Sequence, residues 1–206
     1  MEEFFAYLMS EFGQDNPFSL KDINFKNYSQ PWVCKMLQKL CQEEKVSRFS
    51  SGWYFIPSVT ELGRSSLNPE KLIEKKYLKK DGDVSGFYCG LSLQNRLGLS
   101  DQMPNVPEIM TNNEETRGRT IFVGNRKAII KKSRTTITKE NAIILQLLEA
   151  LSYMGPSYYN EERSSILCRM TKENGITRSQ ICRYLMFFPD KTARNVLESG
   201  VAYAAL

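Results

Sequence analysis

An amphipathic run followed at once by two strand-like runs is the feature that most narrows the fold of this chain. Pro31 opens the run PWVCKMLQKLCQEEK, in which Val33, Leu37 and Leu40 recur at helical spacing. The next residues, VSRFSSGWYFIP at 46–57, place a Ser-Ser-Gly turn between a basic run and an aromatic run, which is typical of a β-hairpin. The sequence therefore predicts a helix joined closely to a hairpin.

Two further helices are predicted before this run. Phe4, Leu8 and Phe12 recur at helical spacing, and Gly13 stands where that helix would end. FSLKDI at 18–23 predicts a second helix start, with Ser19 as N-cap and an imperfect capping box to Asp22. Three short helices followed by a hairpin is the order of a winged helix-turn-helix, in which the third helix enters the major groove of DNA and the hairpin is the wing.

The polar face of the third helix and the hairpin hold the side chains expected to contact DNA. Amide and cationic groups can reach base edges and phosphates. The candidates are Gln30, Lys35, Gln38, Lys39, Gln42, Arg48, Ser50, Ser51 and Tyr54. The alternatives are a solvated face on a plain folded core, or a protein-interaction module. Residues 1–60 carry 6 Lys/Arg against 7 Asp/Glu, so non-specific affinity should be weak and a homodimer on DNA would be needed.

Residues 61–206 are predicted to form a second, mixed α/β domain that ends in helices, which makes the whole chain α+β. The string SVTELGRSSLNPE, from residue 58, is expected to be a linker. Helices are predicted at 69–80 with Asn68 as N-cap, at 86–100, at 136–155 with Thr138 as N-cap, at 160–175, at 176–188 with a Thr177–Gln180 capping box, and at 190–200 with Asp190 as N-cap. Strands are predicted within 106–113, 119–124 and 127–132.

The predicted strands carry a basic run. Between residues 117 and 134 there are seven basic side chains and no acidic one: Arg117, Arg119, Arg126, Lys127, Lys131, Lys132 and Arg134. This run predicts a surface for phosphate or for an acidic protein, and a solvated strand face is the alternative. The string ENGITRSQ at 173–180 resembles a second helix-turn-helix. The end of one helix and the cap of the next often produce the same string in all-helical regions, so the sequence assigns no role to residues 155–206.

Several function classes are disfavoured. The chain has no histidine, which removes the usual general base and the commonest metal ligand. Its five cysteines form no CxxC pair, as is typical of reduced thiols rather than a zinc site. The acidic pairs Asp81/Asp83 and Glu114/Glu115 fall in predicted loops, so neither an enzyme nor a metal or cofactor is expected. The acidic start MEEFFAYLMSEF and the lack of an apolar run of about 20 residues favour a cytoplasmic location without a membrane.

Taken together, several segments resemble the AbiEi-like antitoxins of bacterial abortive-infection (type IV toxin–antitoxin) systems. The segments are RFSSGWYFIPSVTELG, LNPEKLIEKKYL, GLSLQNRLGLSDQMPNVPEIMTNN, RGRTIFVGNRKAIIKKSR and ITKENAIILQLLEAL. The resemblance covers about residues 30–150. The resemblance implies an N-terminal winged helix-turn-helix, repression of the operon's own promoter, and suppression of a cognate nucleotidyltransferase toxin. The sequence does not specify whether toxin and antitoxin bind each other directly.

By position, the resemblance gives the DNA role to Lys35, Gln38, Lys39 and residues 48–54. Arg117, Arg119, Arg126 and Lys127 become the candidates for the second function. A stand-alone winged-helix regulator, whose C-terminal domain dimerises or senses a ligand, is the alternative.

Overall fold

The computed structural model describes residues 1–80, 82–155 and 158–205. The chain is α+β with a helical C-terminal region, as the sequence predicts, and it divides into two compact units. The first unit is Met1–Lys75 with Val123–Arg126, and the second is Lys76–Phe122 with Lys127–Leu206. The first unit thus continues past residue 60, where the sequence analysis placed the boundary. Asp81, which was expected to lie in a loop, is outside the described residues.

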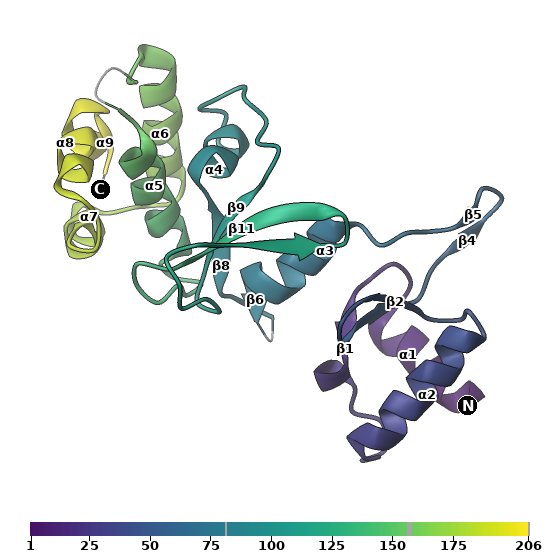
Figure 1. Ribbon diagram of the computed structural model, residues 1–206. Helices are drawn as coiled ribbons and strands as arrows, with labels where there is room; N and C mark the ends of the chain where they lie inside the picture. Colours follow the sequence, from purple (N-terminus) through teal and green to yellow (C-terminus); the bar gives the residue numbers. More distant parts are fainter. Residues whose placement is uncertain (81, 156–157, 206) are drawn as a thin grey trace. The chain divides into compact units, whose positions relative to one another are not determined.

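The first unit is built from two longer helices and a small antiparallel sheet (Figure 1). In chain order its main elements are α1 (Glu2–Phe12), β1 (Phe18–Ser19), the 3-10 turn η1 (Leu20–Asp22), α2 (Gln30–Gln42), β2 (Ser47–Ser50) and β3 (Trp53–Phe55). β3 lies in the middle of the sheet, in the order β1-β3-β2. The core between helices and sheet consists of Phe4, Leu8, Phe18, Phe25, Val33, Leu37, Leu40, Val46 and Ile56.

The second helix expected in this unit is not formed. Ser19 and Asp22 do make the predicted capping box, but only the three residues of η1 follow it. Lys26 and Asn27 then adopt positive φ angles of 47° and 56°, which an α-helix does not allow. Phe25 instead stacks on Trp32 with ring centroids 6.0 Å apart, so aromatic packing takes the place of a helix.

The segment expected to be a linker is partly ordered. It forms a short hairpin, β4 (Val59–Thr60) and β5 (Gly63–Arg64), and is followed by α3 (Pro69–Ile73). The Asn68 side chain accepts a hydrogen bond from the backbone N–H of Glu70, as its predicted N-cap role requires. Lys75 forms an ion pair with Asp22 at 3.0 Å, which ties the end of this segment to the first unit.

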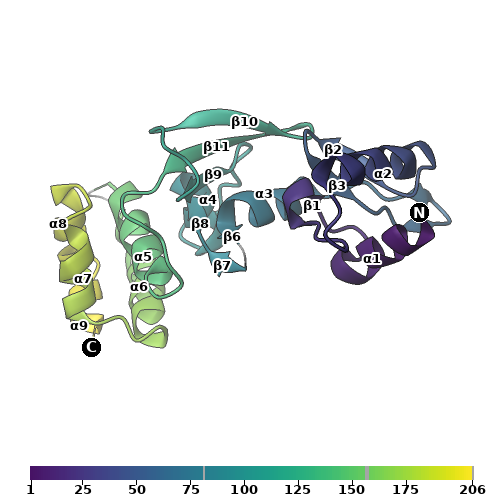
Figure 2. The same ribbon diagram turned by 90° about the horizontal axis from the view of Figure 1, so that it is seen from below.

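The second unit joins a mixed four-stranded sheet to a helical region. The π-helical turn η2 (Glu74–Leu78) leads from the first unit into the second. The hairpin β6 (Lys79–Lys80) and β7 (Asp83–Val84) comes next, followed by β8 (Gly86–Cys89), α4 (Gly90–Arg96) and β9 (Glu108–Thr111). The last two strands are β10 (Arg119–Val123) and β11 (Arg126–Lys132), whose connection, Val123–Arg126, is grouped with the first unit. The sheet order is β10-β11-β9-β8, with β9 antiparallel to β8 and parallel to β11. Figure 2 shows β10 running along β11.

Three expectations for this unit need correction. The helix predicted over 69–80 is α3 followed by a π-helical turn and a short strand. The helix predicted over 86–100 is a strand up to Cys89, because Gly86–Cys89 pairs with β9, and only Gly90–Arg96 is helical. The predicted strands at 106–113, 119–124 and 127–132 are confirmed as β9, β10 and β11.

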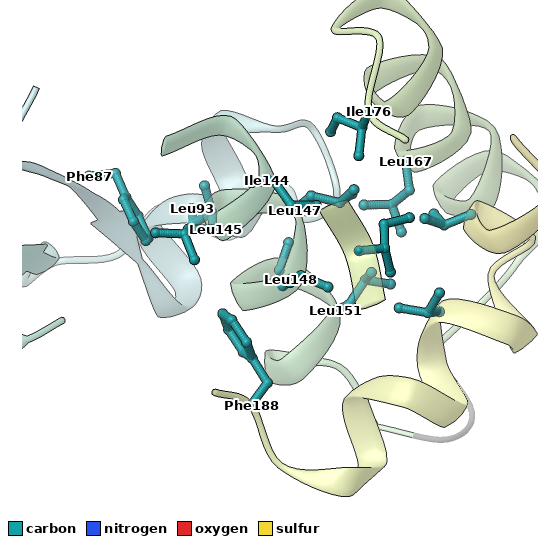
Figure 3. Close-up of a cluster of buried hydrophobic side chains, with 14 of the residues drawn as sticks. Phe87, Leu93, Ile144, Leu145, Leu147, Leu148, Leu151, Leu167, Ile176 and Phe188 are labelled. Carbon is teal, nitrogen blue, oxygen red and sulfur yellow. The ribbon is translucent and has the colours of Figure 1, made fainter. Parts of the chain in front are cut away.

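The helical region is arranged around α5 (Ala142–Tyr153). Ile144, Leu147, Leu148 and Leu151 are buried, and the helix is buried on nearly all sides, as suits a central helix (Figure 3). Around it lie α6 (Glu161–Glu173), α7 (Arg178–Leu185), α8 (Asp190–Glu198) and the short α9 (Val201–Ala204). No helix of the described residues is long and apolar enough to cross a membrane.

Two predicted caps of these helices are wrong by a few residues. Asn141, not Thr138, is the N-cap of α5, and its side chain accepts a hydrogen bond from the Thr138 backbone N–H in a turn before the helix. Asp190 is the first residue of α8, behind Pro189 as N-cap. The capping box of Thr177 and Gln180 at the start of α7 is confirmed.

Candidate nucleic-acid interface

α2 separates an apolar buried side from a polar exposed side. Val33, Leu37 and Leu40 are at most 3% exposed. The opposite side is a stripe of exposed residues that we call the α2 outer face: Lys35, Gln38, Lys39 and Gln42. Their spacing of three, four and seven residues aligns them along the helix. Gln30 is exposed at the start of the same helix.

The α2 outer face is not engaged within the protein. Among residues 1–80, 82–155 and 158–205, none of its four side chains makes a hydrogen bond or an ion pair. Two exposed lysines elsewhere in this unit do form ion pairs, Lys45 with Glu43 and Lys26 with Glu3. The donors and acceptors of the α2 outer face are therefore available to a partner, with no internal contact to break.

The β2–β3 hairpin follows α2 after a four-residue turn. Arg48 pairs with Tyr54 across the two strands, and Ser50 pairs with Trp53 beyond a bulge. The tip is Ser51–Gly52, where Gly52 has a φ of 73° and takes the left-handed conformation that the turn needs. Arg48 and Ser51 are exposed, whereas Ser50 and Tyr54 are half-buried.

The base of the hairpin lies close to the last turns of α2. Tyr54 stacks on Phe18 with ring centroids 6.2 Å apart. Burial raises the pKa of the Tyr54 hydroxyl, and the nearby Arg48 guanidinium partly opposes that rise. Burial likewise raises the pKa of the Cys41 thiol of α2, again against the influence of Arg48. Arg48 is thus near both elements, and Tyr54 serves the packing between sheet and helix.

The basic run predicted to bind an acidic partner lies on and around β10 and β11. Arg119 begins β10, while Arg126, Lys127, Lys131 and Lys132 belong to β11. Arg117 and Arg134 flank these strands. Of the seven basic residues, six are exposed and Lys131 is half-buried. The structure therefore brings the run together on one pair of strands.

The expectation that this run lacks counter-charge is wrong. Within the second unit Arg119 pairs with Glu114 at 2.5 Å, Arg134 pairs with Glu149 at 3.0 Å, and Lys131 pairs with Glu108. The three carboxylates lie outside residues 117–134 in the sequence and reach the strands through the fold. Arg117, Lys127 and Lys132 have no carboxylate partner among the described residues.

Glu114 is the most strongly perturbed of these carboxylates. It is 7% exposed, and it accepts hydrogen bonds from the Thr116 hydroxyl at 2.8 Å and from the backbone N–H groups of Glu115 and Thr116 at 3.1 Å. Burial alone would raise the pKa of this carboxyl, but the bonds from Arg119 and Thr116 outweigh it and hold the pKa at about 2. Arg119 is thus part of a structural loop as well as of the basic run.

Because the folded pKa of Glu114 lies below its ordinary value of 4.5, the carboxylate stabilises the fold above about pH 4.5. This contribution, on the order of 1–2 kcal/mol after allowance for the exposure of Arg119, should be lost as the pH falls towards 2. Urea unfolding at pH 7, 5, 4 and 3 measures it. Glu114→Gln serves as the comparison and should show a shallower loss of stability between pH 5 and 3. Equal pH dependence in both proteins would contradict this assignment.

The sequence could not reveal two of these carboxylates, Glu108 and Glu149, as partners. Glu108 reaches Lys131 only because β9 and β11 pair in parallel, with Glu108 opposite Ile129. Glu149 lies on α5, which packs beside the sheet, and it meets Arg134 fifteen residues earlier in the chain. A signal did exist for Glu114, since Glu-Glu-Thr after Asn-Asn is typical of a carboxylate that binds its own loop.

No matching family is found when the chain is compared with protein-family models, and no matching relative is found among curated proteins. Within the described ranges, no three His, Cys, Asp or Glu side chains are grouped so as to hold a metal ion.

Proposed function

We propose that this protein binds duplex DNA through the α2 outer face and the β2–β3 hairpin, and that it represses its own promoter as an antitoxin of the AbiEi type. The observation that carries the DNA-binding part is the α2 outer face itself. It joins two cations and two amides in one exposed, unengaged stripe, and these are the groups that read base edges and hold phosphates.

The arrangement around α2 supports a winged helix-turn-helix. α2 is followed directly by a hairpin, and β1 from before the helix completes the sheet in the order β1-β3-β2. The helix that would precede the recognition helix is shortened to η1 and an aromatic loop. In this proposal the stacked rings of Phe25 and Trp32 position α2 in place of that helix.

Charge suggests how such a module would bind. Its first 60 residues have no basic surplus, so the electrostatic attraction that drives non-specific binding is small. Affinity would then depend on direct contacts from the α2 outer face and on two copies binding neighbouring half-sites.

The antitoxin part of the proposal depends on the resemblance of residues 30–150 to AbiEi-like proteins. The toxin would be a nucleotidyltransferase, opposed without a requirement for a stable complex. One observation favours the alternative of a stand-alone regulator. Arg119, Lys131 and Arg134 are paired within the second unit, which leaves fewer cations of the basic run for an acidic partner.

Changing Lys35 and Gln38 together to alanine tests the DNA-binding part. Loss of a base contact should weaken binding to the DNA upstream of the gene by about 1–3 kcal/mol, which is roughly 5- to 150-fold in Kd. Fluorescence anisotropy at several salt concentrations measures it. The matched control is Gln14→Ala with Lys26→Ala, which removes one amide and one exposed cation from the same unit and should bind as the wild type does. Equal affinity of the α2 variant and the wild type at every salt concentration rules out α2 as the reader.

A growth assay separates the antitoxin from the stand-alone regulator. The protein is co-expressed with the nucleotidyltransferase encoded beside its gene, where there is one. An antitoxin restores growth, and it should do so even with the Lys35 and Gln38 substitutions, because toxin suppression is assigned to the second unit. Operator binding without any rescue of growth supports the regulator.

A further inference from the structure

The C-terminal helical region contains a helix–turn–helix corner, formed by the end of α6, residues 174–177 and α7. The backbone N–H of Ile176 donates to Thr171 O at 3.0 Å and that of Gly175 to Lys172 O at 3.1 Å, which is the Schellman pattern at a helix end. Gly175 has the φ of 59° that this pattern requires. The capping box of Thr177 and Gln180 then starts α7.

One side of the corner is fixed to the protein core. Ile176 in the turn and Ile181 in α7 are each 3% exposed and belong to the cluster around α5. Figure 3 shows Ile176 within this cluster. α6 and α7 run in clearly different directions in Figure 1. Two helices joined by a four-residue turn that contains glycine is the order of a helix-turn-helix, whose second helix lies in the DNA groove.

The other side of α7 faces away from the core. Ile181 is buried, whereas Arg178, Ser179, Cys182 and Arg183 of α7 and its C-cap Met186 are exposed. Neither Arg178 nor Arg183 has a carboxylate partner among the described residues, and Arg183 lies over the Tyr184 ring. α7 thus repeats the character of the α2 outer face, with unengaged cations and a small polar residue between them.

Charge gathers at this corner. From residue 169 to residue 186 there are four cations, Arg169, Lys172, Arg178 and Arg183, against the single acid Glu173. All four cations are exposed, and none forms an ion pair within the part of the chain that the structure describes. On β10 and β11, by contrast, Arg119 and Lys131 are neutralised by carboxylates.

We propose that the α6–α7 corner is a second DNA-binding surface, in which Arg178 and Arg183 contact backbone phosphates of a duplex. A duplex fits better than an acidic protein because the cations are spread over two helices, as phosphate contacts along a groove require. On α7, Ser179 and Gln180 lie between Arg178 and Arg183 and could add hydrogen bonds to the same backbone. The corner belongs to the second unit, so this site does not depend on the proposed role of α2. With both sites, one chain would hold DNA at two places and gain affinity without a strongly basic first unit.

The test is the salt dependence of DNA binding by the full chain. Each phosphate contact contributes about 0.9 to the slope of log K against log salt, so Arg178→Ala with Arg183→Ala should make the slope less negative by about 2. The probes are the upstream duplex and an unrelated duplex of equal length, because phosphate contacts do not depend on sequence. Arg178→Lys with Arg183→Lys keeps both positive charges and should keep the wild-type slope.

The matched control for charge is Arg117→Ala with Lys132→Ala. It removes the same charge from the basic run and should change the slope by less than about 0.5.

Each outcome decides the matter. A slope change confined to the α7 alanine pair supports the site. An unchanged slope, or an equal change in the strand control, overturns it. Polyglutamate serves as a probe for an acidic protein partner. If the α7 alanine pair loses polyglutamate binding while its DNA binding is intact, the proposal is overturned in favour of such a partner. Repeating the α7 pair in the Lys35/Gln38 variant separates the two proposals, because the α7 effect should persist even where α2 makes no contribution. Thermal unfolding by circular dichroism should give the same Tm for all these surface variants.

Discussion

Replacing Leu148 by alanine is expected to lower the free energy of unfolding of the second unit by about 2–5 kcal/mol. Leu148 lies in the middle of α5 and is 0% exposed (Figure 3). α5 packs against β8, α4, α6, α7 and α8, so a shortened side chain leaves a cavity that no single neighbour can fill by moving. The cost should therefore lie in the upper part of this range.

Urea unfolding followed by circular dichroism measures this loss. The matched control is Leu197→Ala in α8, where the leucine is 59% exposed and the same substitution should change stability by less than about 0.5 kcal/mol. A Leu148→Ala protein as stable as this control would mean that α5 is not at the centre of the helical region.

Replacing Gly86 by alanine is expected to destabilise the second unit by about 3 kcal/mol, at the upper end of the usual cost of overpacking. Gly86 begins β8 opposite Thr111 of β9. An added Cβ would overlap the carbonyl oxygen of Tyr77 and lie 2.8 Å from that of Met110. Both obstacles are backbone atoms, so relief requires the sheet and the π-helical turn to move apart.

Gly118→Ala is the control for this prediction. Its Cβ would lie 3.7 Å from the nearest atom, in the Lys131 side chain, which is ordinary contact. A compatible Gly→Ala change restricts the unfolded chain and should stabilise by about 0.4–1 kcal/mol. The two substitutions should therefore have opposite signs in the same unfolding experiment, and equal signs would contradict the close approach at Gly86.

Local signals of the sequence predicted much of the secondary structure. Helices with a clear apolar period and a cap were found, as at Asn68 and at Thr177, because the cap and the period act over a few residues. The segment after Ser19 was misread because its capping box is real while the helix behind it is not. Left-handed Lys26 and Asn27 and the stacking of Phe25 on Trp32 decide that region, and the stacking depends on tertiary contact.

The strand at 86–89 was missed for a similar reason. Phe87, Tyr88 and Cys89 suit a buried helix or a strand equally well, and the pairing with β9 that selects the strand involves residues about twenty positions away. The same limit applies to the candidate site. The exposed stripe of α2 followed from the helical period alone, whereas the acids that neutralise Arg119, Lys131 and Arg134 are brought in by the fold.

The position of β10 at one edge of the four-stranded sheet has a consequence for the behaviour of the protein in concentrated solution. No strand of the described residues lies on its outer side, and an open edge of this kind can add a strand from another molecule. Arg117, which has no carboxylate partner among the described residues, lies two residues before β10, and repulsion between its charge and that of a second copy opposes such an approach. We therefore expect a substitution that removes the charge of Arg117 to lower the solubility of the protein.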